Sequence, residues 1–266
     1  MLTFVGLGLY DERSVTVEGQ KALRNADRAF AEFYTSRLVG TTVEELSAHH
    51  GVDIEVRDRA GVEQHPEEML DAAASEDVVF LTAGDTMIST THVDLRMRAE
   101  ERGIETRVVH GVTAQSAASG LTGLQNYRFG KAVTLPFPYA HGSDGVPPSV
   151  VESIEANRER GLHTLVYLDI KVGDVPGKKS DEDEFMTGDV AAGILSEWED
   201  ALGVVVARAG SPDPVVAADR LSALEAREFG GPLHLLVVPG TLHHLEAEAL
   251  TELCGAPEDV VEESLA

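Results

Sequence analysis

The stretch Val78-Val79-Phe80-Leu81-Thr82-Ala83-Gly84-Asp85 carries the clearest fold signal in this chain of 266 residues. Its first four residues are apolar without a break, which is typical of a strand buried on both faces of a parallel sheet. Gly84-Asp85 is common turn chemistry, and a helical pattern follows from about residue 91 until Gly103. A buried strand, a turn and a helix in this order indicate a βαβ unit.

The same alternation extends to both sides of this stretch, so we expect an α/β fold with parallel βαβ units in its first half. The capping box Thr42-Val43-Glu44-Glu45 is expected to open one short helix. In the first half the pattern predicts strands at residues 2–7, 28–33, 54–56, 78–81 and 106–109, and helices at residues 15–23, 66–74 and 91–102. In the second half it predicts strands at residues 132–135, 164–168, 203–207 and 233–238, helices at residues 148–160, 190–199 and 242–253, and an exposed loop at residues 172–184.

A run of small, uncharged residues from Gly111 to Gly120 interrupts this texture. Such a run suits a helix packed closely against a ligand or at a domain junction. The chain is also long enough for two domains of ordinary size. We therefore expect two α/β domains, residues 1–111 and 112–266.

Charge is the most unusual bulk property of the chain. There are 46 acidic and 21 basic residues, which gives a formal net charge of -25. The acidic residues are spread along the chain, and such a surface repels phosphate backbones, so we expect no nucleic-acid partner. A salt-rich cytoplasm would screen the self-repulsion, because the Debye length falls to about 3 Å near 1 M salt. We therefore hypothesise a halophilic source.

Several other classes are disfavoured by what the sequence lacks. It has no apolar run of about 18 residues and no basic leader segment, so we expect a cytoplasmic protein without a membrane partner. The single cysteine, Cys254, excludes an internal disulfide, and the adjacent histidine pairs at 49–50 and 243–244 lack metal-ligand spacing, so no metal is expected. There is neither a G-x-S-x-G elbow nor a phosphate-binding P-loop, which disfavours hydrolases and NTPases.

Four segments are placed where an open α/β fold binds ligands, beyond the carboxyl ends of its strands. They are residues 6–11, Gly84-Asp85, the small-residue run with Thr113 and Ala114, and residues 168–171. Each also has a plain structural explanation, as a tight turn, close helix packing or a local ion pair. The first is no dinucleotide fingerprint, because Asp11 stands where G-x-G-x-x-G needs its third glycine.

Taken together, six segments resemble the diphthine synthases, in an order and spacing that extend over nearly the whole chain. They are residues 4–13 (FVGLGLYDER), 31–36 (AEFYTS), 80–85 (FLTAGD), 161–171 (GLHTLVYLDIK), 207–211 (ARAGS) and 238–248 (VPGTLHHLEAE). The chain departs from the common family pattern in two places. Residues 82–86 lack the prolines that often flank Gly-Asp, and Gly111-Val112-Thr113 replaces a more usual Ala-Pro-Ser while keeping a hydroxyl.

The resemblance implies a tetrapyrrole-methylase-like enzyme of two α/β domains, with S-adenosylmethionine in the cleft between them, usually as a homodimer. Archaeal members of the family methylate the amino group of the 3-amino-3-carboxypropyl chain on a histidine of elongation factor 2. Three transfers give diphthine. By position, the resemblance assigns cofactor contacts to Leu9, Asp85, Ile88, Thr113, Ala114, Leu168, Ala209 and His234.

No catalytic residue can be assigned from the sequence. Methyl transfer from a sulfonium is a direct displacement, so no protein nucleophile is needed, but the amine must lose a proton before each attack. Asp169, His234 and solvent are all open as proton acceptors. The alternative functions are a tetrapyrrole or corrinoid methyltransferase of the same class, a nicotinamide-dependent dehydrogenase, and an acidic homo-oligomeric binding protein without activity.

Overall fold

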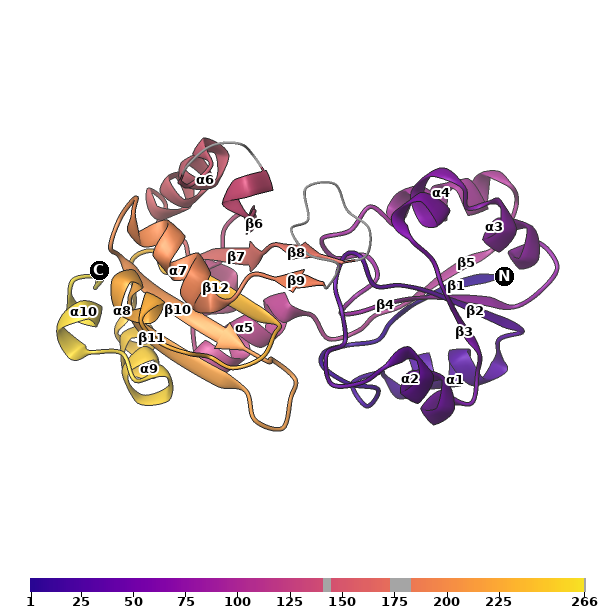
Figure 1. The fold of residues 1–266 in the computed structure, drawn as a ribbon, viewed down its shortest axis with the longest axis horizontal. Helices are drawn as coiled ribbons and strands as arrows, with labels where there is room; N and C mark the ends of the chain where they lie inside the picture. Colours follow the sequence, from indigo (N-terminus) through magenta and orange to yellow (C-terminus); the bar gives the residue numbers. More distant parts are fainter. Residues whose placement is uncertain (141–144, 173–182, 266) are drawn as a thin grey trace. The chain divides into compact units, whose positions relative to one another are not determined.

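The computed structural model describes residues 1–140, 145–172 and 183–265. The chain divides into two units, Met1–Thr113 and Ala114–Ala266, and each has its own main sheet (Figure 1). The predicted α/β fold class is confirmed. In the part of the chain that the structure describes, no helix has the length and apolarity that a membrane span requires.

The first unit is a five-stranded parallel sheet of order β3-β2-β4-β1-β5 with helices on both faces. The two neighbouring strands β1 and β4 are buried at every residue, as expected for a parallel sheet that is covered on both sides. The strands are β1 (Leu2–Gly6), β2 (Arg28–Glu32), β3 (Ile54–Val56), β4 (Val78–Thr82) and β5 (Thr106–Val109). The helices are α1 (Val17–Asn25), α2 (Val43–His50), the π-helix η1 (Ala60–Gln64), α3 (Glu67–Ala73) and α4 (Val93–Glu101).

Two apolar clusters lie on opposite faces of this sheet. One joins Phe4 and Phe80 to helices α3 and α4, and the other joins Val5 to helices α1 and α2. Gly19 interrupts the helical pattern of α1, but a Cβ there would stand only 2.9 Å from Val5 Cγ1. The close contact between helix and strand thus explains a glycine that costs about 1 kcal/mol in a helix.

The predicted strands and helices of the first unit are confirmed, with small shifts at their ends. The capping box of α2 is present, since Glu45 N donates to Thr42 Oγ1 at 3.2 Å and Thr42 N donates to Glu45 Oε2 at 2.9 Å. Helix α1 begins two residues later than predicted because Thr16 is its N-cap, with Thr16 Oγ1 accepting Gly19 N at 3.0 Å. The π-helix η1 was not predicted.

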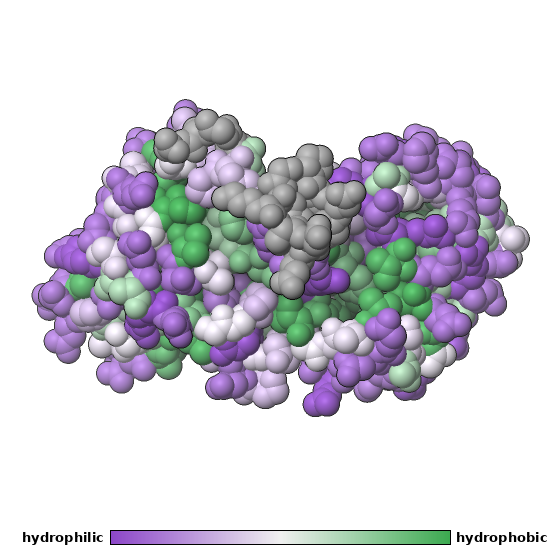
Figure 2. All heavy atoms as spheres, viewed as in Figure 1, coloured by the Kyte–Doolittle hydropathy of each residue, from purple (hydrophilic) through white to green (hydrophobic). Residues whose placement is uncertain are grey.

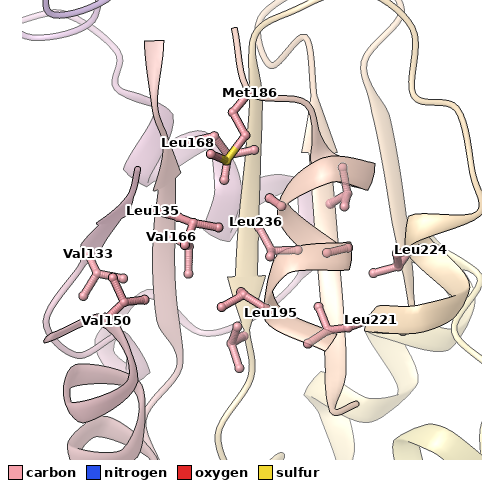
Figure 3. Packing of buried hydrophobic residues seen from close by; sticks show 14 of the residues in the cluster. Val133, Leu135, Val150, Val166, Leu168, Met186, Leu195, Leu221, Leu224 and Leu236 are labelled. Atoms are coloured by element: carbon pink, nitrogen blue, oxygen red, sulfur yellow. The ribbon is translucent and has the colours of Figure 1, made fainter. Parts of the chain in front are cut away.

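The second unit has a mixed sheet of order β11-β10-β12-β7-β6, in which only β6 and β7 run parallel. Helices α6, α7 and α8 cover one face, where Leu195 and Leu221 belong to the same apolar cluster as Val166 and Leu236 of the sheet (Figure 3). Helices α5, α9 and α10 cover the other face. The strands are β6 (Val133–Leu135), β7 (Thr164–Leu168), β8 (Ile170–Lys171), β9 (Glu184–Phe185), β10 (Leu202–Ala207), β11 (Val215–Arg220) and β12 (His234–Val238). The helices are α5 (Ala114–Thr122), the 3-10 helices η2 (Asn126–Arg128) and η3 (Pro138–Ala140), α6 (Pro148–Arg158), α7 (Gly188–Ser196), α8 (Leu221–Glu225), α9 (His244–Cys254) and α10 (Glu258–Glu262).

The sequence pattern missed several elements of the second unit. Strand β11 was not predicted, because its Ala217-Ala218-Asp219-Arg220 lacks an apolar strand pattern and its place is set by antiparallel pairing with β10. Strand β8 and helices α8 and α10 were also missed. The exposed loop predicted for residues 172–184 is wrong at Glu184, which pairs with Lys171 in the β8–β9 ribbon; residues 173–182 of that prediction lie outside the described residues.

Candidate cofactor site

Three loops of the first unit follow the carboxyl ends of the neighbouring strands β4, β1 and β5. The strand order places β1 between the other two. The helix that follows β1 lies on one face of the sheet, and the helix that follows β4 lies on the other. Ligands of open α/β sheets bind at such a switch point. Leu9 lies in the loop after β1, Asp85 and Ile88 lie in the loop after β4, and Thr113 lies in the segment after β5.

Glycines hold these three loops against one another. Gly8 and Gly84 exchange backbone hydrogen bonds of 3.1 and 2.7 Å, and both adopt a positive φ near 75° that favours glycine. A Cβ on Gly111 would stand 2.2 Å from the Gly84 carbonyl oxygen, and one on Gly6 would stand 2.6 Å from Gly111 N. The loops therefore contact one another through bare backbone.

Asp85 braces this cluster with its carboxylate. Oδ1 accepts the Met87 N–H at 2.8 Å, while Oδ2 accepts the Gly111 N–H at 3.1 Å and lies 2.7 Å from His110 Nδ1. Asp85 is only 5% exposed, whereas the His110 side chain is 74% exposed. The Asp85 side chain thus faces the loops, and Ile88, at 42% exposed, presents the open apolar surface nearby in the chain.

In the second unit, three predicted residues lie at one end of the adjacent strands β10, β12 and β7. Leu168 ends β7, Ala209 follows β10, and His234 begins β12. Because β12 is antiparallel to both neighbours, its start lies at the end of the other two, with His234 opposite Ala207. Ala114 begins α5, and its side chain packs against the apolar cluster on one face of the same sheet.

His234 is held by both ring nitrogens. Nδ1 accepts the Gly188 N–H at 2.9 Å, and Nε2 lies 2.8 Å from the Gly231 carbonyl oxygen, to which it donates. Burial lowers the pKa of His234, so its neutral form is favoured. With no lone pair left over, the imidazole cannot take a proton from a substrate without giving up one of these bonds.

Asp169, the other candidate base, is also engaged. Its Oδ2 accepts the Phe137 N–H at 3.1 Å and lies 3.0 Å from Lys171 Nζ. The side chain is 14% exposed. These contacts indicate a role in fixing the segments after β6 and β7.

The structure thus groups Leu9, Asp85, Ile88 and Thr113 along one edge of the first sheet, and Leu168, Ala209 and His234 along one edge of the second. The sequence analysis did not identify two residues that hold predicted site residues: His110, the partner of Asp85, and Gly188, whose N–H donates to His234. Only the position of His110 directly after a strand could have pointed to it. Within the described ranges, no group of three or more potential metal ligands occurs.

Comparison with known proteins gives concordant results. The family described as tetrapyrrole (corrin/porphyrin) methylases matches residues 1–225. A diphthine synthase of Halorubrum lacusprofundi is 74% identical over 99% of this chain and 100% of its own length, and one of Methanosarcina mazei is 48% identical over 98% and 99%. A crystal structure of diphthine synthase superposes with a TM-score of 0.87 at 38% identity and covers 98% of both chains. By sequence and by structure over almost its full length, the chain belongs to the tetrapyrrole methylases and, within them, to the diphthine synthases.

Proposed function

We propose that this chain transfers methyl groups from S-adenosylmethionine to the amino group of the 3-amino-3-carboxypropyl chain on a histidine of elongation factor 2, and that three transfers give diphthine. The chain is an S-adenosylmethionine-dependent methyltransferase of diphthamide biosynthesis. The observation that carries this conclusion is 74% identity to a diphthine synthase along almost the whole chain. The protein substrate is supported by the resemblance of residues 31–36 and 239–248 to the protein-modifying branch of the class.

The two sheet edges fit the chemistry of this cofactor. Glycines in the first unit leave backbone groups, rather than side chains, at the switch point of the sheet, which permits close approach of a ligand. Ile88 offers exposed apolar surface there, and Ala209 is a small residue at the edge of the second sheet. We propose that the residues holding the cofactor are Leu9, Asp85, Ile88, Thr113, Ala114, Leu168, Ala209 and His234.

S-adenosylmethionine supplies a methyl group on a sulfonium sulfur. The chain's own residues then act by positioning, because holding the amine in line with the methyl group can contribute roughly 7–11 kcal/mol to the barrier reduction. Both ring nitrogens of His234 are hydrogen-bonded to backbone groups, the Gly188 N–H and the Gly231 carbonyl. We therefore propose that His234 does not accept the proton of the amine. Since Asp169 is paired with Lys171, we propose that solvent accepts the proton of the amine.

Mass spectrometry of elongation factor 2 tests this function. The factor, carrying the 3-amino-3-carboxypropyl histidine, is incubated with the protein and S-adenosylmethionine in molar KCl. Three methyl increments on the histidine peptide are expected. A fourth would mean that a methyl ester also forms, and no increment from a protein that binds the cofactor would contradict the assignment and favour a tetrapyrrole substrate, which the broader family description names.

We also propose that the protein works as a homodimer in the cytoplasm of a halophilic organism. We propose domains of residues 1–111 and 112–266, a boundary two residues before the division of the two units after Thr113. The net charge of -25 and the relatives from Halorubrum lacusprofundi and Halobacterium salinarum support the salt-rich setting. Light scattering in molar KCl should give twice the mass of one chain. A monomer mass would contradict the dimer.

A further inference from the structure

Glu32 and His92 form a buried pair at the carboxyl ends of β2 and β4. Glu32 is the last residue of β2, His92 directly precedes α4, and their side chains are 0% and 1% exposed. His92 Nε2 lies 3.5 Å from Glu32 Oε1. Among the described residues Nε2 has no hydrogen-bond partner, although leaving a buried polar atom unsatisfied costs about 1–3 kcal/mol.

The contacts of the other ring nitrogen of His92, Nδ1, indicate which nitrogen of the ring carries the hydrogen. Nδ1 lies 3.1 Å from the Thr86 carbonyl oxygen, which can only accept, and 3.4 Å from the Thr82 hydroxyl, which can donate or accept. The shorter contact, with the carbonyl oxygen, favours a hydrogen on Nδ1. In the neutral ring, Nε2 is then a bare lone pair that faces a carboxylate oxygen. Two acceptors facing each other in an apolar interior repel, and a single proton between them removes that repulsion.

Within the described ranges, no lysine or arginine forms an ion pair with Glu32, although the positive charge of Arg59 acts to lower the pKa of its carboxyl. Its carboxylate accepts the Tyr34 and Thr35 N–H groups, both at 3.0 Å, and the Thr35 hydroxyl. The titratable and charged groups that act on the pair from neighbouring segments are Tyr34, Arg59 and Glu63, and Asp58 acts on Tyr34. Arg59 is paired with Glu63 at 3.1 Å and stacks on the Tyr34 ring. Burial raises the pKa of Glu32 and lowers the pKa of His92, so both favour their uncharged forms.

The second unit contains a matched pair without this property. His163 Nε2 lies 3.0 Å from Glu246 Oε1, and His163 Nδ1 accepts the Gly240 N–H at 3.1 Å. Nε2 therefore carries its own hydrogen and donates it. Arg128 Nη1 also neutralises Glu246 at 2.6 Å, so this pair needs no shared proton.

From this geometry we infer that Glu32 and His92 hold one proton between them, and that the proton ties the loop after β2 to the loop after β4, which makes both residues positioning residues for cofactor binding. The connection is short, because His92 holds the carbonyl of Thr86, the residue next to Asp85. The inference deepens the proposed function, since it rests on Asp85 and Ile88 taking part in cofactor binding. When high pH removes the proton, two facing acceptors are restored, the tie loosens and the cofactor binds more weakly.

Titration calorimetry with S-adenosylhomocysteine, the product form of the cofactor, tests the tie across neutral and alkaline pH in molar KCl. Wild-type affinity should fall by about tenfold as the pair loses its proton. Glu32→Gln offers an amide N–H that does not titrate, so it should bind nearly as tightly as wild type and lose the pH dependence. His92→Phe fills the space beside Phe80 but cannot hold Thr86, and it should bind about tenfold more weakly at every pH. The matched Glu246→Gln variant should keep the wild-type pH profile.

Nitrogen-15 NMR of labelled histidine reads the proton without cofactor or turnover. His163 should show a protonated Nε2 and serve as the internal reference. His92 should show a protonated Nδ1 and an Nε2 signal that changes over the pH range in which wild-type binding weakens. A plain Nε2–H form of His92, or an unaltered pH profile in Glu32→Gln, overturns the inference. Failure of the methyl transfer to elongation factor 2, with the NMR result as expected, would count against the proposed function alone.

Discussion

At the residue scale, the Asp85 carboxylate fixes its own loop after β4 through Met87 and joins it to the segment after β5 through His110 and Gly111. Removing it leaves two backbone N–H groups without an acceptor, at about 1–3 kcal/mol each. We expect Asp85→Ala to lower the free energy of unfolding by about 2–6 kcal/mol and to weaken S-adenosylmethionine binding, because the two segments lose the carboxylate that joins them. Scanning and titration calorimetry check the two effects.

His110→Ala is the matched control for Asp85→Ala. It removes only the donor whose side chain is 74% exposed, so stability and cofactor affinity should both change little. If Asp85→Ala binds the cofactor as tightly as wild type does, Asp85 does not belong to the site.

The hydrogen bonds of the buried Glu246 carboxylate predict that the stability of the protein depends on pH. Burial alone would raise its pKa, but hydrogen bonds from the His243 and Gln125 N–H groups and from His163 outweigh burial and hold the pKa below its ordinary value. A carboxylate with a lowered folded-state pKa stabilises the fold above its unfolded pKa, and this contribution is lost as pH falls through the folded pKa. Glu246→Gln should therefore lower Tm at neutral pH and flatten its decline in acid. Glu248→Gln, two residues further along α9 and exposed, should leave the Tm profile unchanged; equal profiles for both variants would refute the assignment.

At the element scale, the packing of the loops after β1, β4 and β5 leaves no room for a side chain at Gly111, where a Cβ would stand 2.2 Å from the Gly84 oxygen. Forcing extra atoms into a packed site costs about 1–3 kcal/mol. We expect Gly111→Ala to destabilise the first unit by at least that amount and to weaken cofactor binding, as measured by chemical denaturation and calorimetry. Gly120→Ala in α5 meets nothing within 4 Å and should instead stabilise by up to about 1 kcal/mol. A harmless Gly111→Ala would show that the loops are not tightly coupled.

The same scale shows what a sequence reveals and what it hides. Buried strands such as β4 could be predicted because a continuous apolar run is visible in the sequence without knowledge of the neighbouring strands. The capping box of α2 could be predicted because its two hydrogen bonds join residues only three positions apart. Strand β11 was hidden because antiparallel pairing with β10, and not its own composition, makes it a strand. The contact of Asp85 with His110 and that of Glu32 with His92 were hidden for a related reason. They join residues 25 and 60 positions apart in the chain, which only the strand order brings together.

At the scale of the whole molecule, charge predicts a dependence on salt. The net charge is -25, and on the face drawn in Figure 2 hydrophilic residues prevail among the described ones. Molar KCl reduces the Debye length to about 3 Å and suppresses repulsion between like charges. Tm should therefore rise markedly between dilute buffer and molar KCl, as followed by circular dichroism. Equal Tm values would contradict the proposed adaptation to salt.

Among the residues that the structure describes, each buried apolar cluster contains residues of one unit alone: two clusters belong to Met1–Thr113 and two to Ala114–Ala266. The consequence concerns cooperativity, because residues that share no core need not melt together. Heating the free protein should give a calorimetric enthalpy larger than the van't Hoff enthalpy, the mark of two melting events. A substitution in the Phe4 cluster should shift only one of them. A ligand that binds groups from both units only when both are folded adds its binding energy to the native state, so it should draw the two events toward one.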